Sequence, residues 1–183
     1  MRLKYKQILS EIELALEGSD LEKSNSVIKE IIQSRSIITY GAGRVGLVMQ
    51  GFSKRLMHLG LNSYYLEDSS VPSTTAGDLL IIGSGSGSTP TVKIVAELAI
   101  SHKLKLLSIT ANPDSAIANI SNLFVYLNTP NKILNNQKAV SIQPLTTLFE
   151  QTLCIYLDAL ILELMEALNQ TNELMKLRHN VIE

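Results

Sequence analysis

Short apolar runs alternate with segments of helical spacing along the middle of this chain. The runs lie at residues 37–40, 63–66, 79–82, 104–109 and 123–127. In most segments between them, hydrophobic residues recur at the spacing of one helix face. Parallel strands read as continuous apolar runs because helices cover both faces of their sheet. The pattern therefore predicts an α/β fold with a five-stranded parallel sheet between layers of helices.

Before the first strand, the same periodicity predicts two helices. The apolar positions of the first helix are Ile8, Ile12 and Ala15. Gly18 is expected to end it. Ser19 and Glu22 have the spacing of a capping box, which predicts the start of the second helix. The apolar face of that helix is expected to comprise Leu21, Ile28, Ile31 and Ile32.

After the last strand, the pattern predicts a polar loop over 128–140 and a long helix over 142–168. Thr171 is expected to begin a final helix that continues to the end of the chain. No linker divides the sequence, so we predict a single domain over 1–183 with helical N- and C-terminal extensions. Because such terminal helices commonly pack against partner subunits, we expect an oligomer.

Composition narrows the function classes. The 183 residues include 16 basic and 17 acidic side chains, for a net charge of −1, so nothing favours a nucleic-acid or membrane surface. No apolar run is long enough to span a bilayer, and the first residues lack the apolar core of a signal peptide. The only cysteine, Cys154, lies in an apolar helical pattern. We expect it to be a small buried residue and the protein to be cytoplasmic.

Two glycine-rich loops each follow a predicted strand and precede a predicted helix. The first glycine loop is the run Gly-Ala-Gly-Arg-Val-Gly at 41–46, and the second is Gly-Ser-Gly-Ser-Gly-Ser-Thr-Pro at 83–90. Glycine lets backbone approach a ligand closely, and the N-terminus of the next helix attracts anions. In the second loop, Thr89 and Pro90 suit the N-cap and first helical position. Its hydroxyl donors for a phosphate are Ser84, Ser86, Ser88 and Thr89.

The first glycine loop also matches the dinucleotide-binding fingerprint. Glu67 and Asp68 follow at the distance where an acidic residue would bind a ribose. However, two helices precede the motif, and the sheet ends after five strands, which leaves no second mononucleotide half. The glycine and serine residues after the third strand have no role in that fold. A dinucleotide-binding oxidoreductase therefore remains an alternative to a phosphate-binding protein.

The motifs of the chain resemble the sugar isomerase (SIS) domain family. Within it, they are most similar to the 6-phospho-3-hexuloisomerases of the ribulose monophosphate pathway, which serves formaldehyde fixation. The resemblance extends over nearly the whole chain and rests on residues 41–44, 55–60, 77–81, 84–87, 109–113, 141–144, 148–151 and 178–179. The sequence departs from the usual motifs at Val45, where serine is common, and at Ser88, where glutamate is common.

The resemblance implies a flavodoxin-like parallel sheet, a homotetramer, and neither cofactor nor metal. It implies an isomerase that converts a 3-hexulose 6-phosphate to fructose 6-phosphate through an enediolate. The pathway partner would be a hexulose phosphate synthase. A non-catalytic SIS module that senses a sugar phosphate is an alternative, because it would keep the phosphate-binding loops without a productive base.

Such an isomerase needs a base beside one carbon–hydrogen bond. Glu150 is the candidate, because Thr146 and Thr147 share its face of an otherwise apolar helix. The match at 178–179 makes His179 the second catalytic candidate, contributed by a neighbouring subunit. Gly43 and Arg44 in the first glycine loop are expected to bind substrate. The three histidines do not have the spacing of metal ligands, so no metal site is expected.

Overall fold

The computed structural model describes residues 2–130 and 141–182. Its elements, in chain order, are α1 (Arg2–Glu17), η1 (Leu21–Lys23), α2 (Ser24–Gln33), β1 (Ile37–Gly41), α3 (Arg44–His58), β2 (Ser63–Tyr65), β3 (Leu79–Ser84), α4 (Pro90–Ser101), β4 (Lys105–Thr110), α5 (Ala116–Ile120), β5 (Leu123–Tyr126), α6 (Thr147–Ala167) and α7 (Asn172–Lys176). Residues 131–140 of the predicted polar loop lie outside the described residues.

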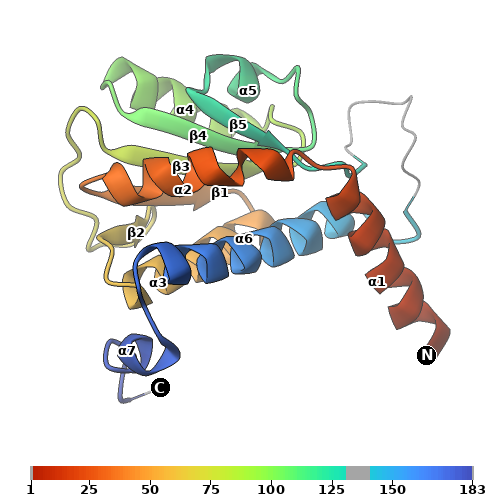
Figure 1. Ribbon diagram of the computed structural model, residues 1–183. Helices are drawn as coiled ribbons and strands as arrows, with labels where there is room; N and C mark the ends of the chain where they lie inside the picture. Colours follow the sequence, from red (N-terminus) through yellow and green to blue (C-terminus); the bar gives the residue numbers. More distant parts are fainter. Residues whose placement is uncertain (1, 131–140, 183) are drawn as a thin grey trace.

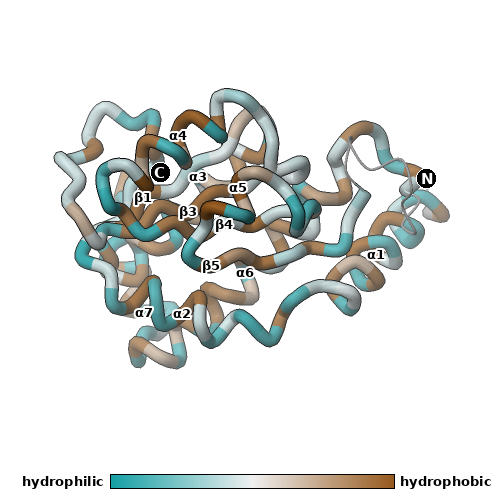
Figure 2. The backbone as a smooth tube through the Cα atoms, turned by 90° about the horizontal axis from the view of Figure 1, so that it is seen from above, coloured by the Kyte–Doolittle hydropathy of each residue, from teal (hydrophilic) through white to brown (hydrophobic). Residues whose placement is uncertain are grey.

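The five strands form one parallel sheet in the order β2-β1-β3-β4-β5. Helices α4 and α5 cover one face, and α2, α3 and α6 lie on the other (Figure 1). All positions of β1 and β3 are buried, as expected for strands covered on both sides. Figure 2 shows the apolar strands running through the middle of the molecule. The α/β fold and five-stranded sheet predicted from periodicity are confirmed.

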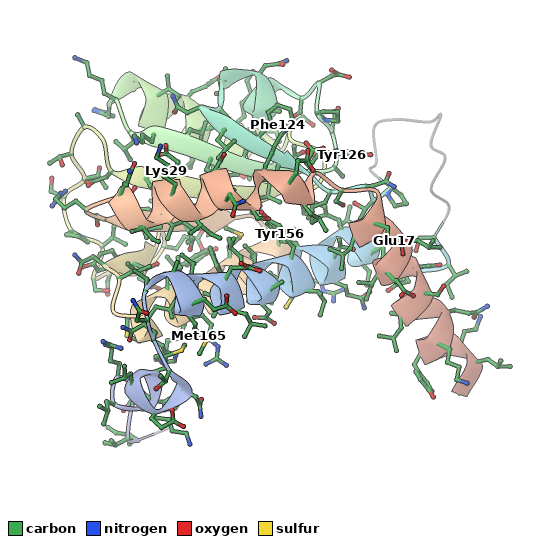
Figure 3. The ribbon with its side chains drawn as sticks, viewed as in Figure 1. Glu17, Lys29, Phe124, Tyr126, Tyr156 and Met165 are labelled. Carbon is green, nitrogen blue, oxygen red and sulfur yellow. The ribbon has the colours of Figure 1, made fainter. Side chains whose placement is uncertain are left out.

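Aromatic side chains lie between the sheet and the helices on the face that carries α2, α3 and α6. Tyr156 and Met165 belong to α6, and Tyr156 is buried on the side of that helix that faces α2 (Figure 3). Phe124 of β5 lies beneath the Lys23 ammonium, which is 4.0 Å from the ring centroid. By contrast, α1 extends away from the sheet in both the ribbon of Figure 1 and the backbone tube of Figure 2. Leu3 and Leu9 on this helix are exposed.

Of two N-terminal predictions, the capping box is wrong, and the apolar face of the second helix is confirmed only at Ile28 and Ile31. The Ser19–Glu22 capping box does not form, because the Ser19 hydroxyl donates to the Ala15 carbonyl at 2.6 Å and accepts the Asn128 N–H at 2.9 Å. Asp20 stands at the N-cap of η1, without a side-chain cap bond. The buried positions of α2 are Val27 and Ile31, whereas the expected Leu21 and Ile32 are exposed.

The C-terminal helices are shorter than predicted. The long helix begins at Thr147 rather than at 142, since Leu145 has a left-handed φ of 56° that no helix accepts. Thr171 does cap the final helix, accepting the Leu174 N–H at 3.3 Å, but that helix ends at Lys176. Cys154 is exposed rather than buried, because it lies on the outer side of α6. In the described part of the chain, no helix combines the length and apolar character needed to cross a membrane.

Candidate active site

A cavity of about 390 Å³ lies at the carboxyl ends of β1 and β3. These strands are neighbours at the point where the strand order reverses, which is where open α/β sheets place ligands. The lining residues come from both glycine loops, from α4 and from the start of α6: Ala42, Gly43, Arg44, Val45, Gly83, Ser84, Gly85, Ser86, Thr89, Val92, Leu145, Thr146 and Glu150. Ser88 and His179 are not among them.

Three helices begin at this cavity. The N-cap residues of α3, α4 and α6 are Gly43, Thr89 and Thr146, and all three line it. None of these helices has a side-chain cap hydrogen bond. The first N–H groups of a helix have no acceptor within it and carry a partial positive charge. The cavity therefore favours an anion through its backbone alone.

The first glycine loop allows α3 to approach β1 closely. A Cβ on Gly46 would lie 2.5 Å from the Gly41 carbonyl oxygen and 2.7 Å from the Tyr65 hydroxyl. That hydroxyl donates to the Gly41 carbonyl at 3.2 Å. Burial, followed by the negative charge of Glu67, raises the pKa of Tyr65 to about 12, so it remains a neutral donor. Tyr65 thus fixes the turn from the end of β2.

The second glycine loop is held by its own hydroxyl groups. Ser84 Oγ accepts the Gly87 N–H at 3.2 Å, and Ser86 Oγ accepts the Ser88 N–H at 3.3 Å. Because each oxygen accepts within the loop, its O–H proton is left to donate to a ligand. Ser88 contributes its N–H to the loop rather than a wall to the cavity.

Residues that follow β4 hold the second glycine loop by hydrogen bonds to its carbonyl groups. The Ala111 N–H donates to the Gly85 carbonyl at 3.1 Å, and the Asn112 amide donates to the Ser86 carbonyl at 3.4 Å. A Cβ on Gly87 would collide with the Ser115 side chain, and its φ is 59°. Gly87 therefore satisfies both a steric and a conformational requirement.

Among the described residues that line the cavity, Glu150 is the only carboxylate. It is 8% exposed, and its Oε1 accepts the Thr146 hydroxyl at 3.1 Å. Arg44 Nε lies 3.2 Å from Oε2. That contact is an ion pair without the direction of a hydrogen bond, and Oε2 accepts no hydrogen bond from the described residues. This buried oxygen therefore has Arg44 as its charged neighbour.

Arg44 is more exposed than its partner, with 64% of its side chain accessible. Its guanidinium also reaches Thr147 Oγ1 at 3.4 Å. A long, exposed arginine tied to a buried carboxylate can turn toward an incoming anion without leaving the cavity. The ion pair contributes little stability, because solvent screens the exposed partner.

His179 lies at the opposite end of the α3–α6 pair. Its ring stacks on His58, with the ring centroids 5.2 Å apart. Both histidines line a second cavity of about 520 Å³ with Cys154 and Asp158. His58 ends α3 and Arg44 begins it, so the rise per residue places them about 20 Å apart. Within one chain, His179 is thus remote from Glu150.

Comparison with known proteins gives the family. The model of the SIS domain matches residues 30–157, which include every strand and both glycine loops. The chain belongs to the SIS domain family. It is 36% identical over 177 residues to 3-hexulose-6-phosphate isomerase of Bacillus subtilis, covering 97% of this chain and 96% of that protein. It is 34% identical over 161 residues to the enzyme of that name from Methanocaldococcus jannaschii, covering 87% and 84%.

A solved structure shows the same arrangement. It is a hypothetical protein from Methanococcus jannaschii, whose structure led to the inference that it is a 3-hexulose-6-phosphate isomerase. The TM-score is 0.85 with 29% identity, and the match covers 98% of this chain and 99% of that one.

Within residues 2–130 and 141–182 of this SIS domain, no three His, Cys, Asp or Glu side chains gather as metal ligands would.

Sequence reasoning missed two residues at the site. Tyr65 fixes the first glycine loop, but its position at the end of a short strand gave no sign of that contact. Leu145 lines the cavity with a positive φ, which is uncommon without glycine. Pro144 was the available signal, since a proline within a predicted helix favours a later start.

Proposed function

We propose that this SIS domain protein is a 3-hexulose-6-phosphate isomerase. It would convert D-arabino-hex-3-ulose 6-phosphate to fructose 6-phosphate through a 2,3-enediolate. Relatives that are 3-hexulose-6-phosphate isomerases, and the related structure from which that function was inferred, support this reaction. The observation that carries the proposal is a buried carboxylate, Glu150, in a cavity whose other polar groups favour anions.

The phosphate would bind at the second glycine loop. Ser84 and Ser86 have O–H protons to donate, and the Thr89 hydroxyl makes no cap bond within α4. The positive end of α4 adds a charge interaction with the dianion. Gly43 leaves open the space that a side chain would fill, so the ligand could approach the backbone of the first glycine loop. The sugar would then extend toward Glu150.

Glu150 would transfer the proton. In the hexulose the carbonyl is at C3, so the base removes the hydrogen from C2 and leaves an enediolate across C2 and C3. Returning the proton to C3, with the hydroxyl proton moving from O2 to O3, places the carbonyl at C2. Arg44 and the N-termini of α3 and α6 would stabilise the negative oxygen, which is the electrostatic contribution such reactions require.

His179 would act from another copy of the chain, because its own Glu150 is too far away. The surface of α6 supports an assembly: Ile155 and Leu162 are exposed, while Leu153 and Leu157 are buried. A helix with large apolar side chains on both its buried and its exposed faces is commonly covered by a partner. A homotetramer remains our prediction, as do a cytoplasmic location and the supply of substrate by a hexulose phosphate synthase.

Proton exchange with solvent tests this function. The protein is incubated in deuterated water with a panel of ketose and aldose phosphates and followed by NMR. We expect fructose 6-phosphate to lose its C3 hydrogen signal and a 3-hexulose 6-phosphate to accumulate. If a different sugar phosphate exchanges its proton instead, that compound is the substrate. Binding of fructose 6-phosphate without exchange would instead favour a sensor, and stabilisation by NAD alone would favour the dinucleotide alternative.

A further inference from the structure

Helix α1 is tied to the rim of the active site through a single carboxylate. Glu11 accepts the Ser141 hydroxyl at 2.7 Å, the Ile142 N–H at 2.9 Å and the Gln143 side-chain amide at 3.0 Å. These donors belong to the Ser-Ile-Gln-Pro motif at 141–144, which the proposed chemistry does not use. Among the described residues, the hydrogen bonds that tie 141–146 to a distant part of the chain all end on Glu11.

The surroundings favour a charged carboxylate at this position. Burial acts to raise the pKa of Glu11, but the hydrogen bonds from Ile142, Gln143 and Ser141 outweigh it and lower the pKa below 4.5. At neutral pH the group is therefore an acceptor at both oxygens. An amide in its place would present a donor to at least one of the three donors now bound.

The anchored segment leads directly to residues that line the cavity. The Pro144 carbonyl accepts the Thr147 hydroxyl at 2.7 Å, which begins α6. Between them, Leu145 is 83% exposed and has a φ of 56°. A non-glycine residue keeps such a conformation only where its surroundings hold it. Thr146 then donates to Glu150.

We propose that Glu11 is a positioning residue for the active site, which holds 141–144 in place and thereby sets Leu145 and Thr146 against the cavity. The kinetic part of this inference rests on the proposed isomerase function. Glu11 does not line the cavity itself, so it acts on Glu150 only through the anchored segment.

The kinetic test compares Glu11→Gln with Glu13→Gln. Glu13 lies on the same helix and is exposed, so its variant is the matched control. We expect Glu11→Gln to lower kcat about 10-fold to 100-fold, the scale of a small misplacement of catalytic groups, with a much smaller change in KM. Glu13→Gln should match the unaltered protein. An unchanged kcat for Glu11→Gln, or an equal loss in both variants, would overturn the proposal.

Coupling to Thr146 separates positioning from a general loss of structure. If Glu11 acts through Thr146, adding Glu11→Gln to Thr146→Val should lower kcat little further. Multiplied losses would show that the two residues act independently. Gln143→Ala removes one of the three donors from the other side, so it should give a smaller loss of the same kind even if Glu11→Gln folds poorly.

Hydrogen exchange provides a readout that does not depend on activity. In the unaltered protein the Ile142 amide should be protected by its bond to Glu11, and we expect this protection to be lost in Glu11→Ala, which removes both acceptor oxygens, but kept in the matched control Glu13→Ala. Equal protection in all three proteins would overturn the anchor. If the unaltered protein isomerises no sugar phosphate while Ile142 behaves as expected, the proposed function fails and the anchor stands.

Discussion

The two ends of the α3–α6 pair differ in the chemistry that they gather. Both helices begin at the active site, where the Arg44 guanidinium reaches Thr147. The positive ends of both helix dipoles lie here, and the buried carboxylate of Glu150 is close to them. At the other end α3 finishes at His58, with His179 stacked on its ring. The same pair of helices thus separates the acidic candidate from the basic one.

Helix electrostatics explains one end better than the other. The Arg178 guanidinium donates to the His58 carbonyl at 3.1 Å, so a cation stands at the negative end of α3, where it stabilises the fold without any ligand. A carboxylate in the first turn of α6 is favourable for the same reason. However, Glu150 keeps a buried oxygen without a hydrogen bond, which costs free energy. Because Glu150 lines the cavity, a ligand bound there could offset that cost, so the active-site end is the more informative one.

Removing the base should give the largest effect. Glu150→Gln keeps the shape of the side chain but cannot accept a proton, so turnover should fall by about 10²–10⁴-fold. Binding of fructose 6-phosphate should change much less, because the second glycine loop is intact. Exchange of the transferred proton, measured by NMR, should fall in parallel with turnover. Glu163→Gln, an exposed change on the same helix, is the control. Near-normal exchange in Glu150→Gln would identify another residue as the base.

Mixing two inactive variants tests whether the two ends meet in an assembly. His179→Ala should lower turnover by about 10²-fold if His179 moves protons among the substrate hydroxyls. A mixed oligomer of Glu150→Gln and His179→Ala chains would contain some sites with both residues intact. Activity should therefore reappear after the two proteins are unfolded and refolded together.

Light scattering provides the necessary control for that experiment. The unaltered protein should have a mass well above the 20.1 kDa of one chain. A monomer at micromolar concentration would leave His179 too far from Glu150 to act on the same substrate. If the protein is an oligomer but the mixed form stays inactive, no active site combines Glu150 of one chain with His179 of another. His179 and its neighbours would then have a structural role.

Two glycines of α3 provide a smaller, steric contrast. Gly46→Ala would place a Cβ against the Gly41 carbonyl, and the required shift should destabilise the protein by about 1–3 kcal/mol. Gly51 has open space around the same position, so Gly51→Ala should stabilise the helix by about 0.5–1 kcal/mol. Thermal unfolding should show opposite shifts in Tm. Equal shifts would contradict the close approach of α3 to β1.

The strands were predictable because their signal is local. Strands β1 and β3 are mostly apolar runs, and the turn after each contains glycine, so their observed bounds lie close to the predicted ones. The sheet order then brings the two glycine loops together. The arrangement of Gly43 and Ser84 around one cavity follows from the parallel sheet rather than from any single motif.

Two of the failures involve contacts between distant segments. Ser19 has the spacing of a cap, but its hydroxyl is used by the Ala15 carbonyl and the Asn128 N–H. The start of α6 is set by the backbone of Leu145, within a segment that Glu11 holds from about 130 positions earlier in the chain. Helical periodicity carries no information on such tertiary contacts.

Replacing Cys154 should have the smallest effect on turnover. It tests whether His179, rather than this neighbouring thiol, contributes the chemistry of the cavity that both residues line. Cys154 lines the same cavity as His179 and is exposed, so it is another candidate there for proton transfer. Desolvation and the nearby Asp158 carboxylate raise the pKa of its thiol above 9.0, so the reactive thiolate is scarce at neutral pH. Cys154→Ser should therefore change turnover by less than about twofold and stability by no more than about 0.5 kcal/mol. Alkylation by iodoacetamide should become faster in Asp158→Asn, because the thiol loses its negative neighbour. A loss of turnover in Cys154→Ser as large as that in His179→Ala would assign the chemistry of the far end to the thiol.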